Sequence, residues 1–253
     1  MRRKSHLPII AVAALALAAC SEDAEVTEPA ADAVALSRGG EGHQNADGVA
    51  SRLYRVTVEN LTGGQPFSPG VVATHTKAAH VFQVGAPASE GVRLIAENGM
   101  PETAVTELTG VDAVFEVKAF PDPLGPIIAG ASGSIQIAAS ANANRLSLVI
   151  MLICTNDGFT GLESVKLPGG FQPAVYYSNG YDAGTEVNTE KSKDIVDACG
   201  AAGPVALPAD GNARTAEGSV IGHHAGIQGI ADLVPAQHGW EDPVAKITIQ
   251  RIE

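Results

Sequence analysis

The sequence predicts an all-β fold, an antiparallel β-sandwich with one or two short helices inserted early. Three observations support this prediction. Short segments rich in β-branched and aromatic residues alternate between apolar and polar positions, glycine and proline stand at nearly every segment end, and the run 146–154 is almost wholly apolar. Alternation is typical of half-buried strands, and a short apolar run is typical of a strand buried on both faces. Two helices placed early among strands do not make the repeating strand–helix unit of a parallel sheet.

The individual elements follow from local patterns. The first strand is expected at 53–60, where Leu-Tyr-Arg-Val-Thr-Val-Glu-Asn alternates before a Gly-Gly turn. A helix is expected at 88–98, because Ser89 suits the N-cap position and a glycine and a proline follow the segment. A second short helix is expected at 102–108. Further strands are expected at 71–75, 81–84, 114–119, 134–139, 146–154, 175–179 and 244–252.

The N-terminal segment predicts export. Three basic residues at positions 2–4 precede an apolar stretch, which ends in Leu17-Ala18-Ala19-Cys20. This pattern is typical of a bacterial lipoprotein signal peptide over residues 1–19, after which Cys20 is acylated. The apolar run is shorter than the roughly twenty residues that span a bilayer. An ordinary secretory signal with Cys20 near the cleavage point by chance is the alternative.

The sequence after the signal divides into two parts. Residues 20–52 are rich in Ala, Glu, Asp and Gly without a period, and we expect a flexible stalk there. Residues 53–253 are expected to form the folded domain. Ser21 stands where an aspartate often accompanies inner-membrane retention, so we expect an exported lipoprotein anchored in the outer membrane of a bacterium.

Charge excludes one class of partner. The signal holds three of the sixteen basic residues and none of the twenty-eight acidic ones, so the remaining chain has a net charge of −15. Phosphate recognition depends on Lys and Arg. We therefore expect no nucleic-acid partner. An acidic surface suits solubility and the binding of cations.

Two cysteines remain once Cys20 is assigned to lipid, namely Cys154 and Cys199. In an oxidising compartment such a pair predicts a disulfide. Two separate buried thiols are the alternative.

Acidic residues gather where strands are expected to end. The segment 155–160 follows the apolar run, and the segment 179–186 follows the next expected strand. Asp182 and Glu186 lie four residues apart across a glycine, and Asp157 adds a third carboxylate. Calcium takes six to eight oxygen ligands, which such loops supply. Both segments are also good β-turn sequences, so ordinary turns are the alternative.

Five blocks of sequence, in order, resemble the spondin N-terminal domain as found in exported bacterial proteins. These are Phe-Ser-Pro-Gly-Val-Val at 67–72, Val-Gly-Ala-Pro-Ala-Ser-Glu-Gly at 84–91, Asn-Asp-Gly-Phe-Thr-Gly at 156–161, Tyr-Asp-Ala-Gly-Thr-Glu at 181–186 and Asp-Pro-Val-Ala-Lys-Ile-Thr-Ile at 242–249. The resemblance implies a C2-like antiparallel β-sandwich with a bound Ca²⁺. Its metal ligands fall on Asp157, Asp182 and Glu186, the last of which is Asp in animal members.

Together these observations predict a lipid-anchored cell-envelope protein with a calcium-binding domain and a binding or adhesive role towards a protein or glycan. We expect no enzymatic activity, because no Gly-x-Ser-x-Gly motif and no evident nucleophile and base accompany the acidic loops. An envelope metal-dependent hydrolase and a purely structural module are the alternatives. His223, His224 and His238 could bind zinc, but adjacent residues of an extended segment point to opposite sides.

Overall fold

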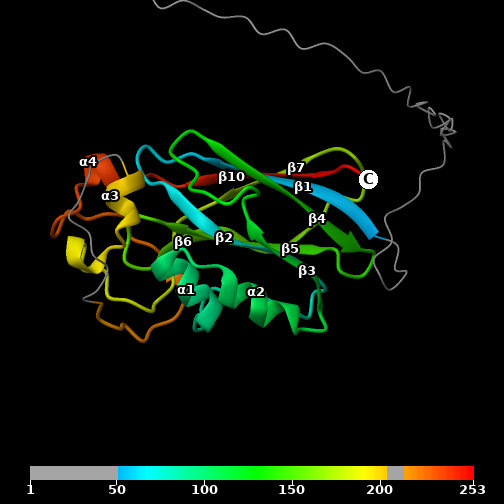
Figure 1. Ribbon diagram of the computed structural model, residues 1–253, viewed down its shortest axis with the longest axis horizontal. Coiled ribbons are helices and arrows are strands. Elements are labelled where there is room, and N and C mark those ends of the chain that lie inside the picture. Colours follow the sequence, from blue (N-terminus) through cyan, green and yellow to red (C-terminus); the bar gives the residue numbers. More distant parts are fainter. Residues whose placement is uncertain (1–50, 204–213) are drawn as a thin grey trace, which may run out of the picture. The chain divides into compact units, whose positions relative to one another are not determined.

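Two antiparallel sheets form the core of the protein in the computed structural model, which describes residues 51–203 and 214–253. The predicted signal peptide, Cys20 and the stalk up to residue 50 lie outside the described residues. The sandwich and the helices inserted between its second and third strands confirm the predicted fold class (Figure 1). Within the described residues, no helix has the length and apolarity needed to cross a membrane.

The smaller sheet has four strands in the order β4-β1-β10-β7. The first and last strands that the structure describes pair with each other, from Tyr54 opposite Arg251 to Asn60 opposite Ala245. The bounds are β1 Ser51–Asn60, β4 Ser132–Ser140, β7 Ala174–Ser178 and β10 Ala245–Arg251. This sheet therefore joins both ends of the described chain.

The larger sheet has six strands in the order β3-β2-β5-β6-β8-β9. Its bounds are β2 Phe67–His75, β3 Val114–Phe120, β5 Arg145–Leu152, β6 Gly158–Lys166, β8 Tyr181–Asp182 and β9 Gly222–His223. The short strands β8 and β9 extend one edge of the sheet, and β8 carries Asp182 of the candidate site.

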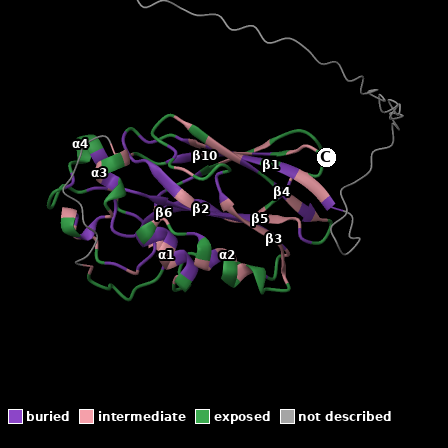
Figure 2. Cartoon of the chain, viewed as in Figure 1, coloured by how far each residue is buried: buried purple, intermediate pink, exposed green. Residues whose placement is uncertain are grey.

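Strand β5 is buried on both faces, as its apolar sequence predicts (Figure 2). Leu148 and Ile150 pack between the two sheets, whereas Val149 and Met151 pack on the opposite face. Helix α1 (Glu90–Asn98) and helix α2 (Glu102–Thr109) cover that opposite face (Figure 1). The domain therefore has three layers, and β5 lies at their centre.

Helix α1 begins and ends where the sequence predicts. The Ser89 hydroxyl accepts a hydrogen bond from the Val92 backbone N–H, and Gly99 has a left-handed φ of 67°. The Glu107 carboxylate on α2 also accepts from the Gly91 N–H. A serine N-cap and a glycine C-cap satisfy backbone groups that a helix end leaves unpaired.

Two predictions about strands are wrong. Residues 81–84 form no strand, because Phe82 packs against the rings of Phe159 and Tyr181 from a loop whose next two residues are exposed. The second error concerns β6, where the sequence predicts a loop at 155–160 and no strand. Its glycines weaken the strand pattern, yet Gly161 is needed there, since a Cβ would lie 1.8 Å from the Leu148 carbonyl oxygen.

Three further short helices lie beyond the sheets. They are the 3₁₀ helix Ser192–Asp194, α3 (Ala198–Ala202) and α4 (Pro235–His238). In Figure 1, α3 and α4 lie at the same end of the sandwich. None of the three was expected, because each is too short to show a helical period.

Candidate cation site

Sheet pairing brings the predicted acidic residues together. Asp157 lies in the turn that joins β5 to β6, and the next residue, Gly158, pairs with Asp182 on β8. The chain then turns at Gly184 and returns to Asp157, whose carboxylate accepts a hydrogen bond from the Glu186 backbone N–H at 2.9 Å. Residues about thirty positions apart in sequence therefore meet at one end of the sheet.

Asp157 is fully buried, and its two oxygen atoms differ in their environment. Oδ2 accepts hydrogen bonds from the Thr185 backbone N–H at 2.7 Å, the Thr185 hydroxyl at 3.1 Å and the Glu186 N–H. Oδ1 is buried without any hydrogen-bond partner. A buried, unpartnered carboxylate oxygen is unfavourable unless something compensates its charge.

Asp182 shapes the turn between the two acidic segments. Its Oδ1 accepts from the Gly184 N–H at 2.7 Å, and its Oδ2 accepts from the Asn188 side chain. Gly184 has a φ of 68°, and a Cβ there would lie 2.7 Å from the Val220 carbonyl oxygen. The glycine is therefore required by both the backbone conformation and the lack of space, and the tight turn expected between Asp182 and Glu186 is present.

Glu186 is buried and has a cationic neighbour. Its Oε1 accepts from the Asn156 amide at 3.1 Å, and its Oε2 has no hydrogen-bond partner. The Arg214 Nε lies 3.6 Å from Oε2, although the same guanidinium also pairs with Glu97 at 3.1 Å. Arg214 thus supplies some positive charge to this carboxylate.

Burial raises the pKa of both buried carboxylates, Asp157 and Glu186. Burial, followed by the charge of Asp182, raises the pKa of Asp157 to about 6, although hydrogen bonds from Glu186 and Thr185 oppose the rise. Burial raises the pKa of Glu186 to about 7. The Asn156 hydrogen bond and the Arg214 charge lower this pKa, and Glu97 and Asp157 raise it. Each anion is therefore unfavourable in its place, and a bound cation would relieve both.

The three carboxylates are suitable ligands for a hard cation such as Ca²⁺, but their oxygen atoms lie too far apart to bind one ion together. Calcium takes only oxygen ligands, and two of the three carboxylates each have an unpartnered buried oxygen. Across residues 51–203 and 214–253, however, only Cys154, Cys199 and His238 have three ligand atoms within 4.8 Å of one another. A shell around one ion would need the three carboxylates to move closer. The calcium triad stays a prediction.

Sequence reasoning missed several neighbours of this site. Asn156 was interpreted only as part of a turn, yet its amide also accepts from the Glu190 backbone N–H. Asp194 is buried with one unpartnered oxygen, and its other oxygen accepts from the Thr189 hydroxyl. Arg214 lacks any local signal, since Glu186 lies 28 residues earlier in the chain and its other partners, Glu97 and Asn98, lie more than a hundred residues earlier.

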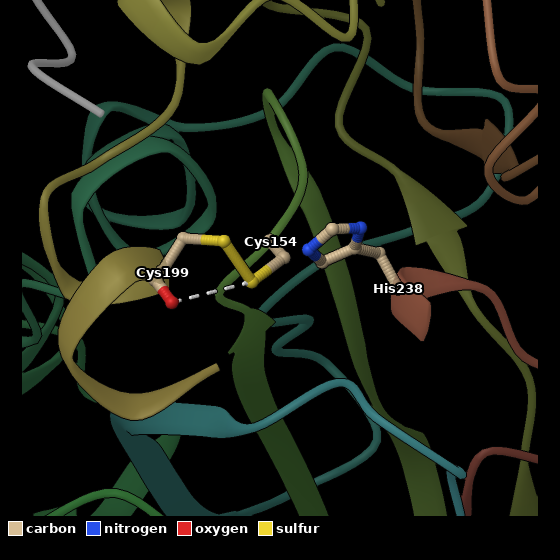
Figure 3. A group of neighbouring side chains, drawn as sticks. All are labelled: Cys154, Cys199 and His238. Atoms are coloured by element: carbon tan, nitrogen blue, oxygen red, sulfur yellow. Dashed lines mark hydrogen bonds between the residues drawn. A yellow bond between two sulfur atoms is a disulfide. The ribbon is translucent and has the colours of Figure 1, made fainter. Parts of the chain in front are cut away.

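The three histidines lie in different environments. The His223 side chain is 62% exposed and its Nε2 lies 2.6 Å from the Asp242 carboxylate. His224 is buried with its ring against Trp240, as expected for neighbours that point to opposite sides. His238 lies beside the disulfide that joins Cys154 to Cys199, which the structure confirms (Figure 3).

Fold and site together define a β-sandwich domain with buried carboxylates in the loops at one end. The Spondin_N family model matches residues 60–196, more than half of the 253-residue chain. The chain therefore belongs to the Spondin_N family. No curated protein sequence matches the chain. The matched segment contains Asp157, Asp182 and Glu186, and it ends before Cys199 and His238.

Proposed function

We propose that this chain is an exported, lipid-anchored envelope protein whose spondin domain binds one Ca²⁺ through Asp157, Asp182 and Glu186. The observation that carries the calcium proposal is a pair of buried oxygen atoms without hydrogen-bond partners, Asp157 Oδ1 and Glu186 Oε2, of which Glu186 Oε2 has the Arg214 Nε at 3.6 Å as a charged neighbour. Both belong to carboxylates whose pKa burial has raised. A divalent cation would offset this unfavourable charge and supply the missing partners.

Asp182 would complete the set from the more open side. It is only half-buried, so a ligand or water could reach the ion there. Asp157 and Glu186, in contrast, are 0% and 1% exposed. This arrangement supports a role in binding a protein or glycan partner through the loops at this end of the sandwich.

The burial of two of the three carboxylates also favours a second candidate, a structural module in which the ion only stiffens the loops. The two candidates differ in one measurable property. If the ion contributes to recognition, partner binding needs calcium and is lost in Asp182→Asn. If the ion is structural, partner binding survives chelation as long as the domain remains folded.

Calcium binding is tested by calorimetry and thermal melting of the purified residues 41–253 in calcium or in excess chelator. We expect one binding site and a higher melting temperature, because a ligand at a hundredfold its dissociation constant stabilises the folded state by about 2.7 kcal/mol. Asp157→Asn, Asp182→Asn and Glu186→Gln should each abolish most of the rise.

The matched controls are Asp112→Asn and Glu241→Gln, which remove carboxylates from exposed positions. They should leave the calcium response intact. Equal melting temperatures in calcium and chelator, with no heat of binding, would show that the acidic segments are only turns.

Lipid anchoring is a separate part of the proposal and rests on the Leu-Ala-Ala-Cys junction. Mass analysis of the membrane fraction should find a chain that begins at acylated Cys20. Cys20→Ser should release the protein from membranes in detergent-free buffer. An unprocessed chain, or one with a free N-terminus elsewhere, would contradict the anchor.

A further inference from the structure

The disulfide lies against a histidine in an enclosed cluster. The sulfur atoms of Cys154 and Cys199 and a ring nitrogen of His238 all lie within 4.8 Å of one another, and all three residues are fully buried (Figure 3). Cys154 follows β5, Cys199 lies on α3 and His238 ends α4. The surrounding side chains include Ile153, Ile195, Ile227 and Leu233 and the buried Gln65, whose amide donates to the Cys154 and His238 carbonyl oxygens; none of these side chains titrates.

The hydrogen bonding of His238 determines where its proton lies. The Val234 backbone N–H donates to Nδ1 at 2.9 Å, so Nδ1 offers a lone pair and the neutral ring carries its proton on Nε2. Nε2 is buried without a hydrogen-bond partner. In Figure 3 the ring edge that bears this nitrogen points towards the disulfide.

The position of this proton distinguishes two possible roles of His238, metal ligand and hydrogen-bond donor. A metal ligand at Nε2 would need a lone pair there, which the Val234 hydrogen bond places on Nδ1 instead. A proton donor at Nε2 needs an acceptor for its hydrogen bond, and an anionic acceptor forms the strongest one. A disulfide sulfur is a poor acceptor, whereas a thiolate in the same place would be a good one.

The backbone at the end of α3 packs against the disulfide. Cys199 lies on the five-residue helix α3, and Gly203 follows at its C-cap. A Cβ at Gly203 would lie 3.0 Å from Cys154 Sγ, so the backbone there packs directly on the sulfur. Because both cysteines are fully buried, a reductant reaches the bond only when part of the surrounding chain moves.

We propose that the Cys154–Cys199 bond is a reducible switch, and that His238 is the positioning residue whose Nε2–H stabilises the thiolate formed when the bond opens. The reductant is an external dithiol. One of its thiolates bonds to a cysteine sulfur, the S–S bond breaks, and the other cysteine leaves as a thiolate next to His238. The second thiol of the reductant then displaces the first protein sulfur. The protein gains two electrons and two protons, and the reductant leaves as a disulfide.

Opening the bond would free the segment that carries the acidic residues. The two cysteines are 45 residues apart, and Asp157, Asp182 and Glu186 all lie between them. This consequence rests on the proposed calcium function. Because linkage is reciprocal, reduction should weaken calcium binding by the same factor by which calcium disfavours reduction.

The test measures the thiol pKa of the reduced full-length protein carrying Cys20→Ser, which leaves Cys154 and Cys199 as the two thiols, by thiolate absorbance across pH. We expect one thiol to titrate below the ordinary value of about 8.5. In His238→Gln, whose side-chain oxygen still accepts from Val234, the pKa should rise by about one unit, a tenfold loss of thiolate. His80→Gln, at an exposed position, is the control and should match the wild type.

A reduced wild-type protein with both thiols near pKa 8.5, or the same pKa in His238→Gln, would overturn the switch. Circular dichroism accompanies each sample, and unfolding on reduction counts against the proposal because the bond is then only structural.

A second experiment equilibrates the protein in a dithiothreitol redox buffer, once with calcium and once with chelator, and measures the fraction of reduced protein. An unchanged equilibrium would refute the coupling but leave the role of His238 standing. Failure of the oxidised protein to bind calcium in calorimetry would refute the proposed function alone.

Discussion

Asp157 holds a negative charge where side chains and backbone, and not solvent, surround it. Three donors converge on one of its oxygens, and the other has none. Natural proteins tolerate such unfavourable groups mainly where function needs them. At the residue scale, the effect of the Asp157 charge on the stability of the calcium-free domain is therefore a direct test of the site.

We predict that the free energy of unfolding of the calcium-free domain falls as the pH rises from about 4 to about 7. Asp157 and Glu186 have pKa values of about 6 and about 7 in the folded state, above the unfolded values of 3.8 and 4.5. The folded state therefore holds more protons in this range, and the free energy of unfolding falls as pH rises.

Asp157→Asn isolates the contribution of this one residue. The variant should be more stable than the wild type in chelator at pH 7, by about 2–3 kcal/mol, and should gain nothing at pH 4. Urea denaturation at both pH values measures the difference. A variant less stable than the wild type at pH 7 would show that the Asp157 charge is already compensated.

At the scale of elements, strand β5 depends on glycines in its neighbours. Gly70 on β2 and Gly161 on β6 approach the Val149 and Leu148 carbonyl oxygens so closely that a Cβ would lie 2.0 Å and 1.8 Å away. The register of β5 shifts near both positions. The two glycines, together with these register shifts, let β2, β5 and β6 approach closely at positions where a side chain would not fit.

We predict that Gly161→Ala lowers the free energy of unfolding by about 3 kcal/mol, because strand β6 must move away from β5. Gly169→Ala is the matched control. A Cβ there meets nothing within 4 Å, so the change should stay within about 0.5 kcal/mol. Urea midpoints compare the two, and equal midpoints would show that β6 adjusts freely.

At the scale of the whole molecule, the disulfide joins the end of β5 to a segment that contains little regular structure. The chain from residue 183 to 197 relies on side-chain contacts such as the Glu190 carboxylate, which accepts from the Ile230 N–H at 2.8 Å. A covalent link that closes 45 residues constrains the unfolded chain, by an amount that depends on the length of the loop.

Replacing both cysteines by alanine should therefore lower the free energy of unfolding by up to about 4 kcal/mol, the chain-entropy value for this loop length. Urea denaturation of the double variant against the oxidised wild type gives the difference. An unchanged free energy would indicate that strain in the native bond offsets the entropic gain.

The features that the sequence predicts correctly depend on neighbouring residues or allow only one interpretation. The Ser89 cap, the Gly99 stop and the apolar run of β5 follow from neighbouring residues alone, and Cys154 had only one partner available once Cys20 was set aside. The pattern failed where packing overrides it. Phe82 is apolar because it joins an aromatic cluster, and β6 contains glycine because β5 leaves no room for a side chain.

The sequence by itself determined the sandwich, its inserted helices, the disulfide partners and the three acidic residues of the candidate site. Only the tertiary structure decided that Asp157 and Glu186 are buried with unpartnered oxygens, that Arg214 lies beside Glu186, and that His238 faces the disulfide. The physical reason is sequence distance. Strand periodicity and helix caps arise from residues a few positions apart. The pairs that meet at these sites lie from about 30 positions apart, as Glu186 and Arg214 do, to more than 80, as Cys154 and His238 do, and they meet only when the sheets form.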